Sequence, residues 1–147
     1  MSTHSYQASL HWDGSTGAGV RGYSRDHTAV AAPGITQVDL SADPAFRGNP
    51  EQLVVMAASS CQMLSFLGVA ARARVDVLAY DDEATSHLDR TAEPARLAAI
   101  HLHVTVRVAA GTDETKVQEL AVHAHRDCYI ANSLSIPVEV TTTVVAP

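Results

Sequence analysis

The sequence predicts an α+β fold in which antiparallel sheets surround two buried central helices. Three patterns support this fold class. Residues 6–40 alternate apolar and polar side chains between turn signals, residues 49–73 are apolar on nearly every face, and residues 97–145 contain two further strand patterns separated by a helical one. Strands repeat with period two and helices with a period near 3.6, so the predicted order is strands, helix, strands, helix, strand.

Length and composition agree with one folded domain. The chain has 147 residues, of which 46% are hydrophobic and 18% are charged, a balance typical of globular proteins. It contains no internal repeat, low-complexity segment or linker-like stretch. We therefore expect a single domain over residues 1–147.

Charge and apolar runs limit the partners that we expect. The net charge is −6 and no basic run could neutralise phosphates, so nucleic acid is not a predicted partner. Residues 1–14 lack the basic stretch and apolar core of a signal peptide. The apolar run 53–71 is interrupted by Ser59, Ser60, Gln62 and Ser65, from which we expect no membrane span. A cytoplasmic location follows as an expectation, and thiols are normally reduced there.

The N-terminal residues predict a three-stranded antiparallel meander. Residues 6–12 alternate strictly and predict a strand with one buried face. A turn is expected at residues 13–19, a second strand at 20–32, a turn at Pro33 and Gly34, and a third strand at 35–40. Residues 41–48 then form a loop before the first helix.

The start of the first helix is well defined. Asn49 is a favourable N-cap, Pro50 suits the first helical position, and the negative charge of Glu51 favours the positive end of the helix dipole. Apolar residues then continue to about Ala73 and cover nearly every face. A helix with this pattern is expected to be central and buried.

The second half of the chain predicts further strands around one more helix. Residues 75–80 predict a short strand, the acidic residues 81–83 a solvated turn, residues 84–91 another strand, and residues 97–108 the clearest strand. A helix opens at residues 111–114, and a final strand covers 138–145. The apolar stripe of this helix comprises Val117, Leu120, Ala121, Ala124 and Cys128.

The two cysteines, Cys61 and Cys128, both fall on apolar helix faces and lie 67 residues apart. They do not form a CxxC redox motif and are too few for a cysteine zinc site. Two interpretations are open: each is a small core residue, or the two form a thiol pair in which one attacks and the other resolves. Composition alone favours the core interpretation.

Two pairs of histidines are candidate metal ligands. His101 and His103 lie on one face of the predicted strand 97–108, but no third ligand is evident nearby, so a solvated sheet face is favoured. His123 and His125 point in different directions on the second helix and cannot easily share a metal. We therefore expect neither a metal nor a cofactor.

Two motifs carry a family resemblance. The first is Asn-Pro-Glu-Gln-Leu at 49–53, followed by Cys61 ten residues after Glu51; the second is the segment from His125 to Ser133, which contains Cys128. Together they resemble the signatures of the OsmC/Ohr family (osmotically inducible protein C and organic hydroperoxide resistance protein), which are thiol-dependent peroxidases. The resemblance covers residues 5–145. It favours the interpretation of the cysteines as a thiol pair over the interpretation as core residues.

The resemblance implies a role for each matching residue. Cys61 corresponds to the peroxidatic cysteine and Cys128 to the resolving cysteine. Glu51 corresponds to a carboxylate that pairs with a catalytic arginine. The family also implies an OsmC-like fold and an intertwined homodimer.

The arginine is not fixed by a local motif, and three candidates precede the first helix: Arg21, Arg25 and Arg47. We favour Arg25, because the predicted strand 20–32 would hold it rigidly. Arg47 adjoins Glu51 but falls in the predicted loop. The residue after the cysteine is Gln62, where close relatives often have histidine or phenylalanine.

The chemistry needs these residue types. A thiolate, not a thiol, cleaves a peroxide bond, and a nearby guanidinium stabilises that anion. Attack gives a sulfenic acid on Cys61, which Cys128 converts to a disulfide that a dithiol reductant reopens. The resemblance implies a lipoyl-type or other dithiol. The apolar side chains of this helix suit organic hydroperoxides with hydrocarbon tails over hydrogen peroxide: Met56, Met63, Leu64 and Phe66.

The sequence therefore predicts a homodimeric peroxidase that reduces organic hydroperoxides. The alternative is a non-catalytic OsmC-like protein that senses redox state or binds an apolar ligand. A geometric argument supports the dimer: Glu51 and Cys61 are about 15 Å apart along one helix, so each Glu51 would serve the Cys61 of an antiparallel twin.

Overall fold

A computed structural model describes residues 4–32, 36–45 and 47–147. Its contacts divide the chain into two compact units, Met1–Leu53 and Val54–Pro147. The expectation of a single domain over the whole chain stays a prediction.

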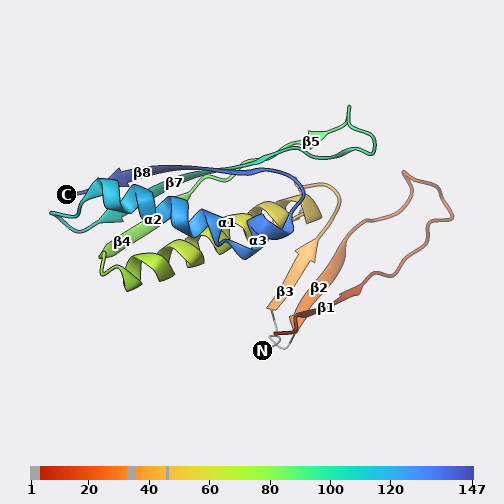
Figure 1. The fold of residues 1–147 in the computed structure, drawn as a ribbon. Coiled ribbons are helices and arrows are strands. Elements are labelled where there is room, and N and C mark those ends of the chain that lie inside the picture. The colour runs from red at the N-terminus through yellow and green to blue at the C-terminus, as the bar shows by residue number, and fades with distance from the viewer. Residues whose placement is uncertain (1–3, 33–35, 46) are drawn as a thin grey trace. The chain divides into compact units, whose positions relative to one another are not determined.

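The first unit contains the predicted meander. Strands β1 (Gln7–His11), β2 (His27–Ala32) and β3 (Thr36–Leu40) form one sheet in the order β1-β2-β3, and both pairs are antiparallel (Figure 1). The predicted turn at residues 33 and 34 lies outside the described residues. The expectation that one face of the first strand is buried is wrong, because all five residues of β1 are exposed.

The second strand is shorter than predicted. It begins at His27 and not at Val20. The reason lies in pairing: β1 ends at His11, and the last pair between the two strands joins His11 to Thr28. A strand needs a neighbour for its backbone hydrogen bonds, and residues 20–26 have none in this sheet. Arg25 therefore lies in the loop before β2.

Helix α1 (Pro50–Arg72) has the predicted start and ends one residue before the predicted end. The side-chain oxygen of Asn49 accepts a hydrogen bond from the backbone N–H of Gln52 at 2.9 Å, and the Gln52 side chain accepts one from the backbone N–H of Asn49 at 3.0 Å. This reciprocal capping satisfies two N–H groups that a helix start would otherwise leave unpaired.

One face of α1 is buried within the chain, which differs from the burial on all sides that the sequence predicts. The buried residues are Ala58, Gln62, Phe66, Val69 and Ala70. By contrast, Met56 is 53% exposed and Leu64 is 64% exposed.

The length and composition of α1 also correct an expectation. An 18-residue stretch of this 23-residue helix reaches a mean hydropathy of 1.8, so the helix is long and apolar enough to cross a membrane by these two criteria. The serines and the glutamine therefore do not by themselves exclude a span, and the expectation that the chain has no membrane span stays a prediction. Core helices of globular domains meet the same criteria, and the buried face of α1 packs in the core described below.

The second unit is built on a three-stranded sheet. Its strands are β4 (Val77–Asp82), β7 (Ile100–Val108) and β8 (Val138–Val145), in the order β4-β7-β8. Strands β4 and β7 are antiparallel, whereas β7 and β8 are parallel because helices connect them. The sheet is therefore mixed and not antiparallel throughout. Strands β5 (Leu88–Asp89) and β6 (Arg96–Leu97) form a separate pair.

Two helices connect β7 to β8. Helix α2 (Glu114–Arg126) begins where predicted, and its N-cap Asp113 accepts hydrogen bonds from the backbone N–H groups of Thr115 and Lys116. Helix α3 (Tyr129–Ser133) is short. Cys128 lies between the two helices as the N-cap of α3, so its predicted place on the second helix is wrong.

The core lies between this sheet and helices α1 and α2 (Figure 1). Alternate residues of β7 point into it, and each is at most 2% exposed: Ile100, Leu102, Val104, Val106 and Val108. Phe66 of α1 and Val117 of α2 are among the helix residues that they meet. The other residues of β7 are exposed or half-buried, which confirms the predicted solvated face.

The acidic residues 81–83 do not form the predicted turn. Asp81 and Asp82 belong to β4 and pair with Thr105 and Val104 of β7. Asp82 is half-buried, and its carboxylate accepts a hydrogen bond from the hydroxyl of Ser59. A charged residue continues a strand when its side chain finds a partner, as here.

Candidate thiol site

The structure brings the two cysteines together in the second unit. Cys61 lies near the middle of α1 and is half-buried, whereas Cys128 is only 1% exposed. The Cys61 side chain is close enough to contribute to the raised pKa of Cys128. Both thiols are free. One thiol of the pair is therefore accessible and the other is enclosed.

Two hydrogen bonds join α1 to α2 just after Cys61, from Gln62 and from Ser65. The hydroxyl of Ser65 donates to the backbone carbonyl of Ala124 at 2.9 Å. The side-chain amide of Gln62 donates to the backbone carbonyl of Ala121 at 3.5 Å. Both acceptors are carbonyls of the neighbouring helix, so the bonds fix the two helices against each other. Gln62 is 1% exposed and helps to build this contact.

Cys128 is held by the turn that joins α2 to α3. Its backbone N–H donates to the carbonyl of His125 at 3.2 Å. The side-chain amide of Asn132 donates to the carbonyls of Cys128 at 2.8 Å and of Arg126 at 2.9 Å. Asn132 therefore positions the turn that carries Cys128. It belongs to the second motif, but the sequence did not indicate this role.

The surroundings of Cys128 disfavour its thiolate. Burial raises the pKa of the Cys128 thiol above its usual value, because a buried thiolate loses its hydration. The backbone N–H of Ala131 opposes this rise in pKa, and the neighbouring Cys61 adds to it. Cys128 therefore stays protonated at neutral pH.

A cavity of about 730 Å³ opens beside Cys61. Cys61 lines it, whereas Cys128 does not. Its walls come from α1, from the end of α2 and from α3, so a molecule in the cavity can reach the first thiol without reaching the second. The lining residues are Cys61, Leu64, Ser65, Gly68, Val69, Arg72, Arg126, Asp127, Tyr129 and Asn132.

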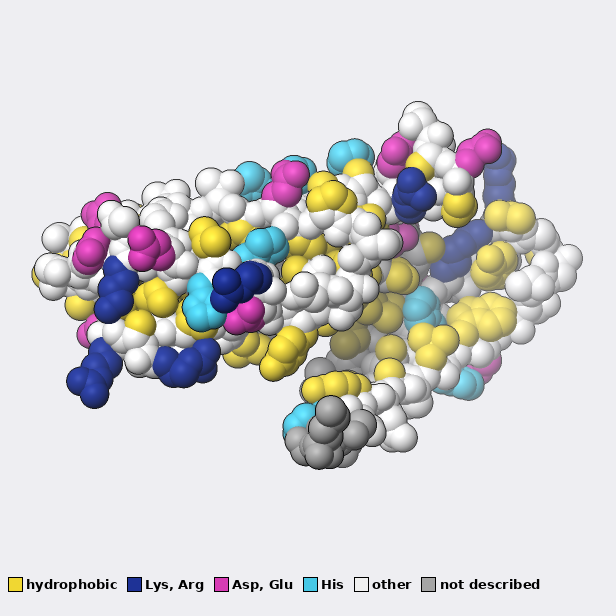
Figure 2. Space-filling model, in the orientation of Figure 1, with side chains coloured by type: hydrophobic (Ala, Val, Ile, Leu, Met, Phe, Trp, Pro, Cys, Tyr) yellow, Lys and Arg dark blue, Asp and Glu magenta, His cyan; other side chains and the backbone are white. Residues whose placement is uncertain are grey.

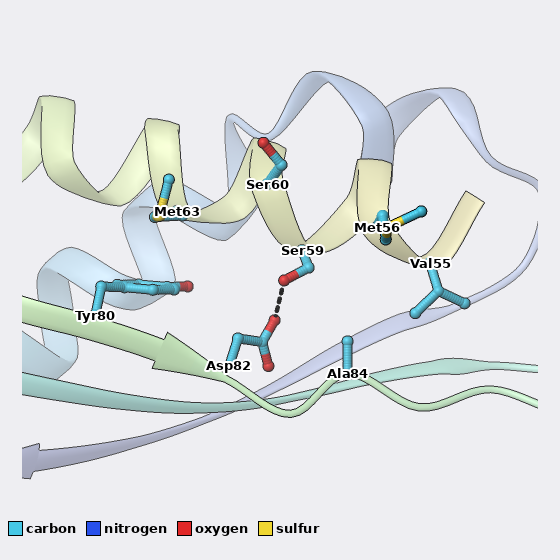
Figure 3. A pocket seen from close by; sticks show the side chains of 8 residues that line it. All are labelled: Val55, Met56, Ser59, Ser60, Met63, Tyr80, Asp82 and Ala84. Atoms are coloured by element: carbon cyan, nitrogen blue, oxygen red, sulfur yellow. Dashed lines mark hydrogen bonds between the residues drawn. The ribbon is translucent and has the colours of Figure 1, made fainter. Parts of the chain in front are cut away.

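A second cavity of about 420 Å³ lies between α1 and β4 (Figure 3). There the Ser59 hydroxyl donates to Asp82 at 2.5 Å. Burial raises the pKa of the Tyr80 hydroxyl, and the negative charge of Asp82, together with that of Cys128 once this thiol ionises at high pH, raises it further. The ring of Tyr80 also packs against Phe66, with centroids 5.8 Å apart. Tyr80 therefore remains a neutral hydroxyl near the enclosed thiol.

Arg25, the favoured catalytic arginine, lies in the first unit. Its guanidinium donates to the carbonyl of Val20 at 2.6 Å and stacks over the ring of Tyr23, with its central carbon 4.4 Å from the ring centroid. These two contacts, and not a strand as the sequence predicts, position the side chain of Arg25. Arg21, in the same loop, is exposed.

Arg47 has carboxylate partners in the first unit. It forms ion pairs with Asp26 at 3.4 Å and with Asp39 at 3.8 Å. Glu51 is exposed in the first turn of α1 and also belongs to this unit. The pairing of Glu51 with an arginine, and of that arginine with Cys61, stays a prediction.

The histidines take part in local contacts. His101 pairs with Glu139 of β8 at 2.9 Å and stacks on His103, with ring centroids 6.4 Å apart. His123 pairs with Asp127 at 3.0 Å. Within residues 4–32, 36–45 and 47–147, no three histidine, cysteine or acidic side chains come together in a way that could hold a metal ion.

One family of known proteins matches most of the sequence. The family model described as OsmC-like protein matches residues 42–143, a segment that includes Glu51 and both cysteines. No curated protein matches the sequence.

Several solved structures share the fold. An OsmC-like protein of unknown function from Vibrio cholerae is 27% identical, with a TM-score of 0.83 over 97% of this chain and 100% of that one. The organic hydroperoxide resistance protein OsmC of Legionella pneumophila is 19% identical, with a TM-score of 0.72 over 98% of each chain. The organic hydroperoxide resistance protein OhrB of Bacillus subtilis is 17% identical, with a TM-score of 0.63 over 97% of this chain and 98% of that one.

The two hydroperoxide resistance proteins are too distant in sequence to show more than the fold. The family model, in contrast, covers well over half of the chain and includes both cysteine motifs. These findings confirm both the predicted family and the predicted α+β fold class. The chain belongs to the OsmC-like family.

Proposed function

We propose that this protein is a thiol peroxidase that reduces organic hydroperoxides to alcohols and protects the cell under oxidative stress. One observation carries the proposal: a half-buried thiol on a cavity wall, Cys61, lies beside an enclosed and protonated thiol, Cys128. The resistance to organic hydroperoxides named for two proteins of the same fold supports this choice of substrate.

In the first step, the Cys61 thiolate attacks one oxygen of the hydroperoxide. The O–O bond breaks, the sulfur is oxidised to a sulfenic acid, and the other oxygen leaves as an alcohol after it takes up a proton. The cavity beside Cys61 has the apolar walls that an organic tail needs, with Leu64 and Val69 among them.

In the second step, the sulfur of Cys128 attacks the Cys61 sulfenic acid. A disulfide forms, and the sulfenic oxygen leaves as water with the proton of Cys128. An external dithiol then reduces the disulfide by exchange, which returns both thiols and leaves the dithiol as its own disulfide. A lipoyl-type dithiol fits the family, and a cytoplasmic location would keep that reductant available.

The thiolate of Cys61 needs a positive partner, and we assign this role to Arg25, held by Glu51. An opposite charge within about 4–6 Å favours the ionised thiol. A carboxylate can fix a guanidinium through two parallel hydrogen bonds. Arg47 and Arg21 are the alternatives, and Arg47 is the weaker candidate because Asp26 and Asp39 already pair with it.

We also propose a homodimer in which both chains build each site. Helix α1 is continuous from Pro50 to Arg72, so Glu51 and Cys61 are about 15 Å apart along its axis. The antiparallel α1 of a second chain would bring its Glu51 to this Cys61. The exposed Met56 and Leu64 give α1 an apolar face for that contact.

A single-turnover experiment tests the proposal. The reduced protein is mixed with one equivalent of cumene hydroperoxide, and the loss of peroxide is measured. We expect wild type and Cys128→Ser to consume the equivalent, and only Cys128→Ser to accumulate a sulfenic acid that dimedone traps. Cys61→Ser should consume none.

Equal consumption by Cys61→Ser and wild type would contradict the assignment of the attacking thiol. If the wild type forms the disulfide with peroxide but shows no repeated turnover with dihydrolipoamide or dithiothreitol, a redox sensor is the better description.

A further inference from the structure

We propose that Tyr23 is a positioning residue for Arg25: its ring, anchored by Trp12, holds the guanidinium in the orientation that stabilises the Cys61 thiolate. The inference rests on the proposed function, which assigns Arg25 to that thiolate. It concerns two aromatic residues of the first unit that neither cysteine motif includes. A loop with such a clamp can hold an arginine as firmly as the strand that the sequence predicts.

The distribution of charge requires an arginine that is held in place. The chain carries a net charge of −6, and on the visible face the acidic side chains lie among the Lys and Arg side chains (Figure 2). The overall field therefore does not favour a thiolate. One guanidinium must lie within about 4–6 Å of the sulfur to lower the pKa of its thiol. A long side chain in a loop stays in such a position only when further contacts restrict it.

Trp12 closes the loop between β1 and β2. Its indole N–H donates to the backbone carbonyl of Ser24 at 2.9 Å, which joins two residues 12 positions apart. The Trp12 ring also lies close to the backbone of Gly14, where an added β-carbon would come within 2.8 Å of the ring. Compact loops whose own side chains join their ends are frequently functional. The chain is therefore fixed at Ser24, the residue between Tyr23 and Arg25.

Tyr23 contacts both Trp12 and Arg25. Its ring lies nearly perpendicular to the Trp12 ring, at 79°, with the two centroids 6.0 Å apart. The central carbon of the Arg25 guanidinium lies 4.4 Å from the Tyr23 centroid, which is within the range of cation–π contacts. Tyr23 and Arg25 are both half-buried, so water screens this contact only in part. The Tyr23 ring therefore links the arginine to the closed end of the loop.

The held orientation leaves most donors of Arg25 available. Contact through the face of a guanidinium fixes its plane without using any N–H group. One terminal nitrogen donates to the carbonyl of Val20 at 2.6 Å. Among the residues that the structure describes, no acidic side chain forms an ion pair with Arg25. The remaining N–H groups can therefore bind the carboxylate of Glu51 while the positive charge serves Cys61.

The first test measures the pKa of the Cys61 thiol in Cys128→Ser protein, from the rate of alkylation by iodoacetamide against pH. Tyr23→Leu removes the ring and should raise this pKa by about 0.4–0.7 unit, because a cation–π contact at a partly exposed site favours the held side chain about two- to fivefold. Tyr23→Phe keeps the ring face and should leave the pKa near the parent value. Tyr6→Leu is the matched control, because Tyr6 is 88% exposed in the same unit, and it should change nothing.

A double-mutant cycle separates positioning from a general loss of structure. Arg25→Ala should raise the pKa of the Cys61 thiol by more than Tyr23→Leu does. In the Arg25→Ala background, Tyr23→Leu should cause no further rise, because no guanidinium remains to be held. Additive rises would overturn the inference, since Tyr23 would then act on Cys61 without Arg25. A pKa in Tyr23→Phe as high as in Tyr23→Leu would overturn it as well, because the ring face would not be the group that matters.

The anchor at Trp12 is tested without thiol chemistry. Trp12 is the only tryptophan of the chain, so its fluorescence reports on this loop alone. Tyr23→Leu should increase the quenching of this fluorescence by acrylamide and lower its anisotropy, because the indole loses its aromatic neighbour. Tyr23→Phe should leave both quantities unchanged. Equal quenching in Tyr23→Leu and the parent protein would show that Trp12 does not anchor the ring.

Three outcomes separate the inference from the proposed function. If Arg25→Ala raises the pKa of the Cys61 thiol and Tyr23→Leu does not, the catalytic arginine stands and the inference fails. If Arg25→Ala leaves that pKa unchanged, the assignment of the arginine fails and the inference fails with it. If both variants raise the pKa but the wild type consumes no cumene hydroperoxide, the peroxidase function fails and the positioning of Arg25 by Tyr23 stands.

Discussion

The enclosed state of Cys128 predicts how disulfide formation depends on pH. Burial raises the pKa of this thiol above its usual value of 9.0. The resolving step needs the sulfur of Cys128 as a nucleophile, and the thiolate is the reactive form. The rate of disulfide formation should therefore follow the small fraction of Cys128 that is ionised, and it should rise with pH through the neutral range and beyond.

The size of the effect follows from the position of that pKa. A thiol with a pKa above 9 is ionised in fewer than about one molecule in a hundred at pH 7. Each unit of pH raises this fraction about tenfold until the pKa is reached. Between pH 7 and pH 9 we therefore expect the rate to rise about a hundredfold, without a plateau.

The assay follows the sulfenic acid of Cys61 after one equivalent of cumene hydroperoxide. Samples are quenched at increasing times with a trapping reagent, and intact mass spectrometry separates the trapped form from the disulfide. Cys128→Ser is the control, because its sulfenic acid should persist at every pH. That control separates resolution by Cys128 from any side reaction of the sulfenic acid.

A rate that levels off below pH 8 would refute the reasoning. It would mean that Cys128 ionises more easily than its burial implies, or that another group removes its proton in the transition state. A rate that does not change with pH, together with normal disulfide yield, would have the same consequence.

Three further predictions concern other residues. Arg25→Ala should raise the pKa of the Cys61 thiol, because the thiolate loses its positive partner. The pKa is measured from the rate of alkylation against pH, and the rise should exceed that in Arg47→Ala and Arg21→Ala. A larger rise in either of those two variants would change the assignment. Glu51→Ala and Cys61→Ser, refolded together, should regain activity in heterodimers, and failure in verified heterodimers would place each site within one chain. Asn132→Ala removes two hydrogen bonds and should lower the free energy of unfolding by about 1–2 kcal/mol, measured by urea denaturation, with slower disulfide formation; unchanged rates would deny Asn132 a positioning role.

Stability should also depend on pH through Cys128. Its pKa is raised in the folded protein, so its contribution to the free energy of unfolding is fully present below the pKa of the unfolded thiol. As the pH rises above about 9, the unfolded chain ionises first and that contribution is lost. Cys128→Ser should show a smaller loss of stability between pH 8 and pH 10 in urea titrations, and an identical pH profile would contradict the role of burial.

The elements that follow from local chemistry were predictable from the sequence. Helix α1 begins at Pro50, as its cap residue Asn49 indicates, because the cap satisfies the helix start with groups only three residues apart. Strand β8 has the predicted bounds of Val138 and Val145. Strand β7 shows the alternation that its sequence implies, since one face meets the core and the other meets solvent.

The elements that depend on distant partners were not predictable in the same way. The late start of β2 at His27 depends on where β1 ends, which the sequence of β2 does not contain. The break after α2 falls within a continuous apolar stripe, and the side chain of Asn132 supports it from six residues away. Asp82 continues β4 because Ser59, 23 residues earlier, donates to it.

In the candidate site, too, the features that a local motif carries were predictable and those that depend on the folded chain were not. Cys61 and Cys128 could be paired through the family motifs, and the structure places them together. Asn132 lies in the second motif, but its hydrogen bonds to the carbonyls of Cys128 and Arg126 depend on the turn between α2 and α3, which the motif does not reveal.

The uncovered apolar side chains of α1 have a consequence for the newly made chain. Met56 and Leu64 are more than half exposed on the longest helix of the protein. Large apolar side chains that stay exposed on one helix face promote aggregation until a partner covers them. If a second chain is that partner, heat stability becomes a property of the solution as well as of the fold: the melting temperature should rise with protein concentration, because mass action favours the folded, associated state.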